Sequence, residues 1–256
     1  MKVILKRTMV EIAANLKTIR DKISQAAARR ALDHRYYEPQ LVAVGKLHSS
    51  ESIVAAYEAG QRHFGENYVN ELLEKATNPL ILEKCEDIKW HFIGNLQRNK
   101  VNKILTAPNL HVIETVDNEK LANALNNSWP KLRRNEDSQL NVMVQVNTSQ
   151  EKEKHGCDAA QAPALAKYII DSCPNLKFIG LMTIGMYGYD CANGPNPDFI
   201  SLIKCREMVC EELGLDVKNV DLSMGMSTDY EQAIELGSTS VRVGTAIFGN
   251  RPPKNT

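Results

Sequence analysis

The chain has 256 residues, a length typical of one large α/β barrel domain. Its 31 basic and 31 acidic residues give a formal net charge of zero, which argues against a nucleic-acid partner or an anionic membrane surface. No apolar run approaches the length of a membrane span, so we expect no membrane association.

Short apolar segments alternate with segments of helical spacing along the whole chain. Strands are predicted at residues 41–44, 62–64, 88–93, 111–115, 140–146, 178–183, 220–222 and 241–243. Helices are predicted at 8–31, before the first strand, and then at 52–59, 68–76, 97–105, 118–127, 159–171 and 198–213. Thr228 and Glu231 form a capping-box pattern that opens the last helix, and Gly237 closes it.

This alternation predicts an α/β fold with a single domain over residues 1–256, a closed (β/α)8 (TIM) barrel. No helix-length segment follows the last strand, so we expect the N-terminal helix to cover that side of the barrel. An open doubly wound sheet is the alternative fold, but the chain has no GxGxxG motif.

The last two strand ends carry small residues suited to a phosphate group. Ser223 and Ser227 follow the seventh strand, and Gly244 and Thr245 follow the eighth. Such corners offer unobstructed backbone amides and hydroxyls, and the loops after strands 7 and 8 commonly bind phosphate in this fold. Ordinary turn residues are the alternative for either corner alone, but both corners match, which favours a phosphate site.

Arg242 lies within the eighth strand, between Val241 and Val243. Because strand side chains alternate, the valines are expected to pack under helices while Arg242 points into the barrel. A charge there needs a partner, so either a ligand or a buried structural ion pair is predicted.

Lys46 follows the first apolar strand directly, at the end of the barrel where active sites lie. A poorly solvated lysine can present a free amine that condenses with an aldehyde. A solvated strand-end lysine is the alternative. Together, an imine-forming lysine, a phosphate site and a cation near a ring match the binding demands of pyridoxal 5′-phosphate (PLP).

Several motifs resemble one family, the pyridoxal phosphate homeostasis proteins. They are Ala43-Val44-Gly45-Lys46, Phe64-Gly65-Glu66-Asn67-Tyr68, Trp90-His91-Phe92-Ile93-Gly94, Gly180-Leu181-Met182-Thr183-Ile184-Gly185, Leu222-Ser223-Met224-Gly225-Met226-Ser227 and Val241-Arg242-Val243-Gly244-Thr245. That family is similar to the barrel domain of alanine racemase, the fold-type III arrangement of PLP-binding proteins.

The resemblance implies a role for each matching residue. Lys46 would hold PLP as an internal Schiff base, Arg242 would face the pyridine nitrogen, and Asn67 would lie near the ring, with a helix N-cap as its alternative role. The phosphate would be bound by Ser223, Gly244 and Thr245. No residue is assigned as catalytic, and His91 is expected near the barrel mouth without a role.

Two positions within the matching motifs carry residues that differ from those of related proteins. Ile184 occupies the place of a histidine in racemases, so the ring would meet an apolar surface. Gly45 replaces the serine common in the family, and we expect this change to act through backbone flexibility.

The function implied is intracellular PLP homeostasis, that is, storage, protection or delivery of the cofactor. Racemases of this fold use a catalytic tyrosine from a second domain, and this chain ends before such a domain could begin. A PLP-dependent amino-acid racemase or lyase with an unidentified base is the first alternative, and a barrel aldolase using Lys46 is the second. Amino or keto acids and PLP-dependent apo-enzymes, in transient contacts, are the other partners expected of a monomer.

The cysteines and histidines do not show the sequence spacing of a metal site. The six cysteines form no CxxC pair and fit reduced thiols, while the six histidines are scattered, with no HExxH or HxH. We therefore predict no metal site. The protein is expected to be cytoplasmic, and the Lys- and Arg-rich start of the chain leaves a mitochondrial address as the alternative.

Overall fold

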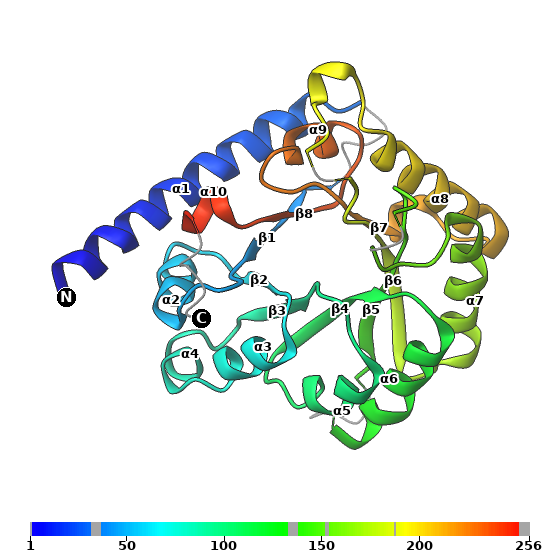
Figure 1. Ribbon diagram of the computed structural model, residues 1–256, viewed down its shortest axis with the longest axis horizontal. Helices are drawn as coiled ribbons and strands as arrows, with labels where there is room; N and C mark the ends of the chain where they lie inside the picture. The colour runs from blue at the N-terminus through cyan, green and yellow to red at the C-terminus, as the bar shows by residue number, and fades with distance from the viewer. Residues whose placement is uncertain (1, 32–36, 133–137, 152–153, 187, 251–256) are drawn as a thin grey trace.

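Eight parallel strands close into a barrel in chain order, with β8 pairing back to β1 (Figure 1). The computed structural model describes residues 2–31, 37–132, 138–151, 154–186 and 188–250. The strands are β1 (Gln40–Val44), β2 (His63–Glu66), β3 (Lys89–Phe92), β4 (Leu110–Val116), β5 (Leu140–Gln145), β6 (Leu176–Met182), β7 (Asp221–Ser223) and β8 (Ser240–Val243). The predicted (β/α)8 barrel is confirmed.

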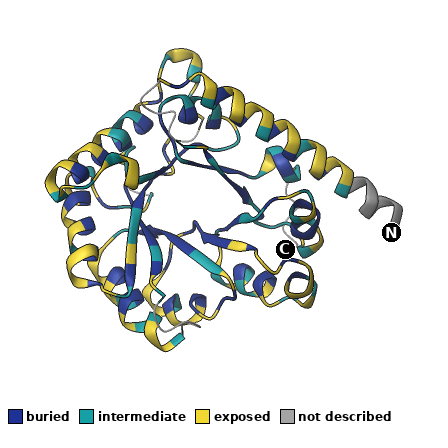
Figure 2. Ribbon diagram, turned by 180° about the vertical axis from the view of Figure 1, so that it is seen from behind, coloured by how far each residue is buried: buried dark blue, intermediate teal, exposed yellow. Residues whose placement is uncertain are grey.

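Helices surround the barrel and turn their exposed faces outward (Figure 2). They are α1 (Lys2–Ala28), α2 (Ser50–Glu58), α3 (Val69–Ala76), α4 (Pro79–Lys84), α5 (Val101–Ile104), α6 (Glu119–Leu132), α7 (Ala162–Ser172), α8 (Pro197–Leu213), α9 (Tyr230–Glu235) and α10 (Thr245–Phe248). The main apolar core lies between these helices and the strands, and it includes Val241 and Val243. A separate small apolar cluster contains Ile93, Val112, Met143 and Met182.

Helix α1 covers the side of the barrel near β8, as expected. Its buried residues Ile12, Leu16, Ile19 and Ile23 recur every three or four positions and form one apolar stripe. Beyond the helix, the guanidinium of Arg30 donates hydrogen bonds to the carbonyl oxygens of Ile234 (2.8 Å) and Ser238 (2.6 Å). In Figure 1, α1 runs alongside α10 and α9, so the first helix supplies cover that the one-turn α10 is too short to give.

The observed helices differ from the predicted ones at several points. Helix α4 was not predicted; Asn78 caps it by accepting a hydrogen bond from the Leu80 amide, with Pro79 at its first position. The helix predicted at 97–105 is a 3₁₀ turn at Arg98–Lys100 followed by the short α5.

The capping box at Thr228 is also not formed. Helix α9 begins at Tyr230, because the carboxylate of Asp229 accepts the Met226 amide (2.6 Å) and keeps the preceding residues in a turn. Both the strand end and the helix start therefore lie one residue later than the sequence pattern indicated.

Within the described ranges, no helix is long and apolar enough to cross a membrane.

Candidate functional site

Lys46 lies directly after β1, at the C-terminal end of the barrel, where the strand pattern predicts it. Strand β1 pairs with β2 through Val44 and Gly65 and with β8 through Ala43 and Val243. The side chain is half-buried, and its ammonium nitrogen lies 5.3 Å from the centre of the Tyr68 ring. This position leaves the amine at the rim of the barrel mouth, beside the ends of β2 and β8.

A buried charge cluster holds the loop that carries Lys46. The Lys75 ammonium donates to the carbonyl oxygen of Gly45 (2.7 Å) and to the carboxylates of Glu66 (2.7 Å) and Glu71 (2.8 Å). The amide of Leu47 donates to Glu71 in turn. The residues on both sides of Lys46 are therefore fixed by one ion-pair cluster.

The same cluster contains a carboxyl group with a shifted pKa. Burial raises the pKa of Glu66 to about 7, although the Lys75 charge and hydrogen bond pull it down. Sequence reasoning missed this cluster; its only local signal is the i, i+4 pair of Glu71 and Lys75 on α3.

Gly45 packs closely against two side chains, which adds a steric effect to the expected effect on backbone flexibility. A Cβ atom at this position would lie 2.5 Å from the Cδ1 atom of Ile53 and 2.8 Å from the Oε1 atom of Glu66. Both distances are far below ordinary contact, so a serine here would have to displace these side chains.

Arg242 points into the barrel and is 4% exposed. Its guanidinium donates to the hydroxyl of Ser223 (2.6 Å) and to the carbonyl oxygen of Thr183 (2.7 Å). The Ser223 hydroxyl donates to the Glu114 carboxylate (2.6 Å), which also bonds the His91 ring (2.6 Å). Arg242 thus faces the interior, and the structure shows the buried charged network that was one of its two predicted alternatives, while the ligand role stays a prediction.

In this network, nearby opposite charges counteract the effect of burial on the pKa of both Arg242 and Glu114. Burial lowers the pKa of Arg242, and the charges of Glu114 and Asp229 oppose that shift. Burial pushes the pKa of Glu114 up, but the hydrogen bonds and charges of His91, Arg242 and Ser223 outweigh it, so the pKa lies below its usual value. Glu114 therefore acts on Arg242 through its charge and through the Ser223 hydroxyl that bridges the two groups.

The corners after β7 and β8 meet at the barrel mouth. The Ser227 hydroxyl accepts a hydrogen bond from the Gly244 amide at 3.3 Å, while Gly244 is half-exposed and Thr245 is exposed. Ser223 differs from these residues, since it is fully buried and its hydroxyl is engaged by Arg242 and Glu114. The structure thus brings Ser227, Gly244 and Thr245 together at the surface of the mouth and places Ser223 beneath them.

Asn67 follows β2 and is half-buried. The N-cap of α3 is Tyr68, so the alternative N-cap role of Asn67 is not observed. A Cβ atom at Gly94 would lie 1.9 Å from the Asn67 carbonyl oxygen, which means that the ends of β2 and β3 approach each other only with glycine there. Ile184, after β6, exposes 37% of its surface at the same end of the barrel.

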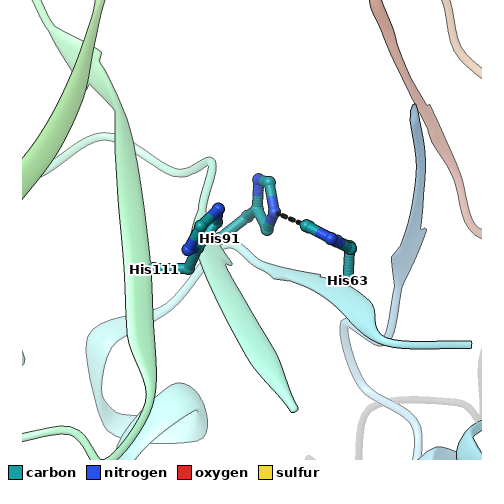
Figure 3. A group of neighbouring side chains, drawn as sticks. All are labelled: His63, His91 and His111. Atoms are coloured by element: carbon teal, nitrogen blue, oxygen red, sulfur yellow. Dashed lines mark hydrogen bonds between the residues drawn. The ribbon is translucent and has the colours of Figure 1, made fainter. Parts of the chain in front are cut away.

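Three histidines that are scattered along the sequence lie together in space. His63 of β2, His91 of β3 and His111 of β4 place ring nitrogens within 4.8 Å of one another (Figure 3). His91 is buried within the barrel, not at its mouth as expected. Motifs such as HExxH describe residues close together in sequence, so they do not detect histidines that three separate strands bring together.

Burial keeps two of these rings neutral. It lowers the pKa of His63 to about 3 and that of His111 to about 4, and the charges of His91 and Lys89 act in the same direction.

Comparison with known proteins identifies the family. Residues 11–252 match the model of the alanine racemase N-terminal domain. The pyridoxal phosphate homeostasis protein of Homo sapiens is 50% identical over 240 residues, which are 94% of this chain and 86% of that protein. The chain belongs to the pyridoxal phosphate homeostasis protein family. The resemblance inferred from the motifs around Lys46 and Arg242 is therefore confirmed.

Solved structures agree with this family assignment. PipY of Synechococcus elongatus, with PLP bound, has 29% identity and a TM-score of 0.73, over 93% of this chain and 100% of that chain. Alanine racemase of Corynebacterium glutamicum has a TM-score of 0.60 at 14% identity, over 97% of this chain but 62% of the racemase. The likeness to the racemase is one of fold alone.

Proposed function

We propose that this family member binds PLP through a Schiff base to Lys46 and serves in PLP homeostasis by storing, protecting or delivering the cofactor. The observation that carries the proposal is the position of Lys46, whose loop is already fixed on both sides by Lys75 and Glu71. A related chain, PipY, has a structure with PLP bound that this chain matches over its full length.

The residues at the mouth fit the phosphate of PLP. Ser227, Gly244 and Thr245 offer two hydroxyls and backbone amides at the meeting point of two loops. A Cβ atom at Gly244 would lie 3.1 Å from the Val44 carbonyl oxygen, so glycine lets this loop lie close to the end of β1, near Lys46. We propose that Ser223, Gly244 and Thr245 bind the phosphate together with Ser227, and that Ser223 also fixes Arg242.

The same mouth fits the ring of the cofactor. PLP supplies an aldehyde for an amine and a ring that withdraws electrons. The guanidinium of Arg242, which is always charged, would donate a hydrogen bond to the ring nitrogen and so leave that nitrogen unprotonated. We propose that Asn67 and Ile184 line the ring edge and face. An unprotonated ring is a weaker electron sink, which favours holding the cofactor over catalysis.

The other partners belong to the same proposal. We propose a cytoplasmic monomer that contacts PLP-dependent apo-enzymes transiently and accepts amino or keto acids as ligands at the bound cofactor. An amino-acid racemase or lyase on the same cofactor is the alternative function, and it needs a proton-transferring base in contact with the substrate.

Absorption spectroscopy with chemical trapping tests the proposal. Purified protein is mixed with PLP, reduced with borohydride and mapped by peptide analysis. A visible imine band, with the reduced cofactor on the peptide of Lys46, is the expected result. Lys46→Ala should abolish the band, whereas Lys154→Ala, which removes another half-buried lysine, should keep it.

Two outcomes would overturn this reading. A colourless protein that gains no band with PLP would exclude cofactor binding. Turnover of an amino acid that is lost in Lys46→Ala would exclude a pure carrier and support the racemase or lyase alternative.

A further inference from the structure

We propose that His63, His91 and His111 form a binding site for one divalent transition metal ion of the zinc class. The three residues come from neighbouring strands: His63 is the first residue of β2 and His111 the second of β4, while His91 lies further along β3. His91 shares the Glu114 carboxylate with Ser223, which in turn bonds Arg242, so the site adjoins the proposed cofactor site. Metal binding by the three histidines does not require the cofactor.

The geometry of the rings suits a shared ion. Ring centroids are 5.1 Å apart for His63 and His91, and 5.4 Å apart for each of the other two pairs, which makes a nearly equilateral triangle (Figure 3). Three imidazole nitrogens at about 2.0–2.1 Å from a tetrahedral zinc ion lie roughly 3.3 Å apart. All candidate ligand atoms lie within 4.8 Å of one another, so small side-chain rotations bring them to that spacing.

A buried carboxylate orients the central histidine as a ligand. The Glu114 carboxylate lies 2.6 Å from Nδ1 of His91, so this nitrogen carries the proton and Nε2 presents its lone pair. That lone pair faces Nδ1 of His63 at 2.8 Å. A carboxylate that bonds the far nitrogen of a metal-binding histidine is the usual second layer of such sites. The metal would replace the proton shared by His63 and His91, with His63 carrying its proton on the other ring nitrogen.

The surrounding charges act in both directions. Lys89, next to His63 across the strands, repels a cation, and the buried charge of Glu114 attracts one. Access is provided by a surface cavity of about 470 Å³ that reaches His63 and is lined by Gln40, Gln61 and Lys89. Water in this cavity can supply the fourth ligand.

The donor set selects the class of ion. Three imidazoles suit zinc, copper, nickel or cobalt, whereas magnesium and calcium require oxygen ligands. Bound between these side chains, the ion would tie β2, β3 and β4 together and so stabilise the fold.

The experiment uses the full chain without a histidine tag, after treatment with a chelator. Zinc chloride is titrated by calorimetry, cobalt(II) is titrated by visible absorption, and thermal unfolding is recorded with and without zinc. We expect one ion per chain, a rise in the unfolding midpoint with zinc, and the intense visible bands of tetrahedral cobalt.

Matched variants locate the site. His63→Gln and His111→Gln are half-exposed positions, and each should weaken zinc binding at least about tenfold, as loss of a supporting contact alone does. His155→Gln is the control, because His155 lies after β5 and outside the cluster, and it should bind zinc like the wild type.

Two results would overturn the proposal. One is wild-type protein that takes up less than one ion per chain at micromolar zinc. The other is undiminished binding in both His63→Gln and His111→Gln. If both variants fail to fold, the cobalt spectrum of the wild type still tests the proposal. Octahedral cobalt bands in that spectrum would refute tetrahedral binding by three histidines.

Discussion

The Lys75 ammonium lies 2.7 Å from the carbonyl oxygen of Gly45, the residue directly before Lys46. The same ammonium group pairs with Glu66 and Glu71, and Glu71 also accepts the amide of Leu47. A side chain on α3 therefore sets the path of the loop after β1. The residues on both sides of Lys46 are therefore held by charges from β2 and α3.

Replacing Lys75 should destabilise the fold and loosen this loop. Lys75→Met leaves the fully buried Glu66 carboxylate without its cation, which typically costs about 3–5 kcal/mol. Denaturant unfolding at pH 8 measures the loss, and PLP titration should show weaker binding. The double variant Lys75→Met/Glu66→Gln removes the unpaired charge and should recover part of the stability. A loss below about 1 kcal/mol, the value of an exposed pair, would contradict the burial argument.

The raised pKa of Glu66 predicts a specific pH dependence of stability. Its pKa is about 7 in the folded protein against 4.5 for an ordinary glutamate, so between these values the folded state holds a proton that the unfolded state has released. Stability from this group is complete below pH 4.5 and is lost as the pH rises through 7. The total is about 3 kcal/mol.

Glu66→Gln isolates this effect. Urea unfolding at several pH values between 5 and 8 should show the wild type losing stability relative to the variant as the pH rises. If the difference between the two proteins stays constant over this range, the assignment of the shifted pKa to Glu66 is wrong.

Gly45→Ala should destabilise the protein by crowding. The new methyl group meets Ile53 and Glu66 well inside contact distance, and overpacking of this kind costs about 1–3 kcal/mol. Ile53→Val removes the closest atom, so the double variant Gly45→Ala/Ile53→Val should lose less stability than the sum of the single variants. Strictly additive losses in thermal unfolding would show that the two positions do not collide.

Arg242→Ala should weaken PLP binding at least about tenfold, because a charged hydrogen bond is lost, while borohydride still traps the cofactor on Lys46. It should also destabilise the fold, since Glu114 keeps its charge without the guanidinium. Arg242→Lys retains a charge and separates the two effects. Unchanged PLP affinity in Arg242→Ala would mean that Arg242 does not face the ring.

The barrel and the positions of Lys46 and Arg242 follow from local patterns. Apolar runs that end in glycine or lysine mark strand ends, and alternation within β8 places Arg242 on the inner face. Both signals depend on residues adjacent in sequence, which is why they could be predicted.

The partners of these residues depend on contacts between distant strands. Glu114 and Ser223 meet because β4 and β7 face each other across the barrel interior, and no periodicity in either segment reveals it. His63, His91 and His111 come together partly through a register shift between β3 and β4, which the sequence does not mark. The crowding at Gly45 was not predicted for the same reason, because Ile53 and Glu66 approach it only in the folded chain.

The pairing of Gln40 with Ser240 has a consequence for synthesis on the ribosome. Translation proceeds from the N-terminus, so α1 and β1 leave the ribosome long before β8 has been synthesised. The apolar stripe of α1 therefore stays without its partners from the end of the chain during that time. The barrel can close only after nearly the whole chain has been released. Until then Leu16 and Ile19, which are buried in the folded protein, remain at least partly exposed. We expect chaperones to bind this apolar surface of the nascent chain.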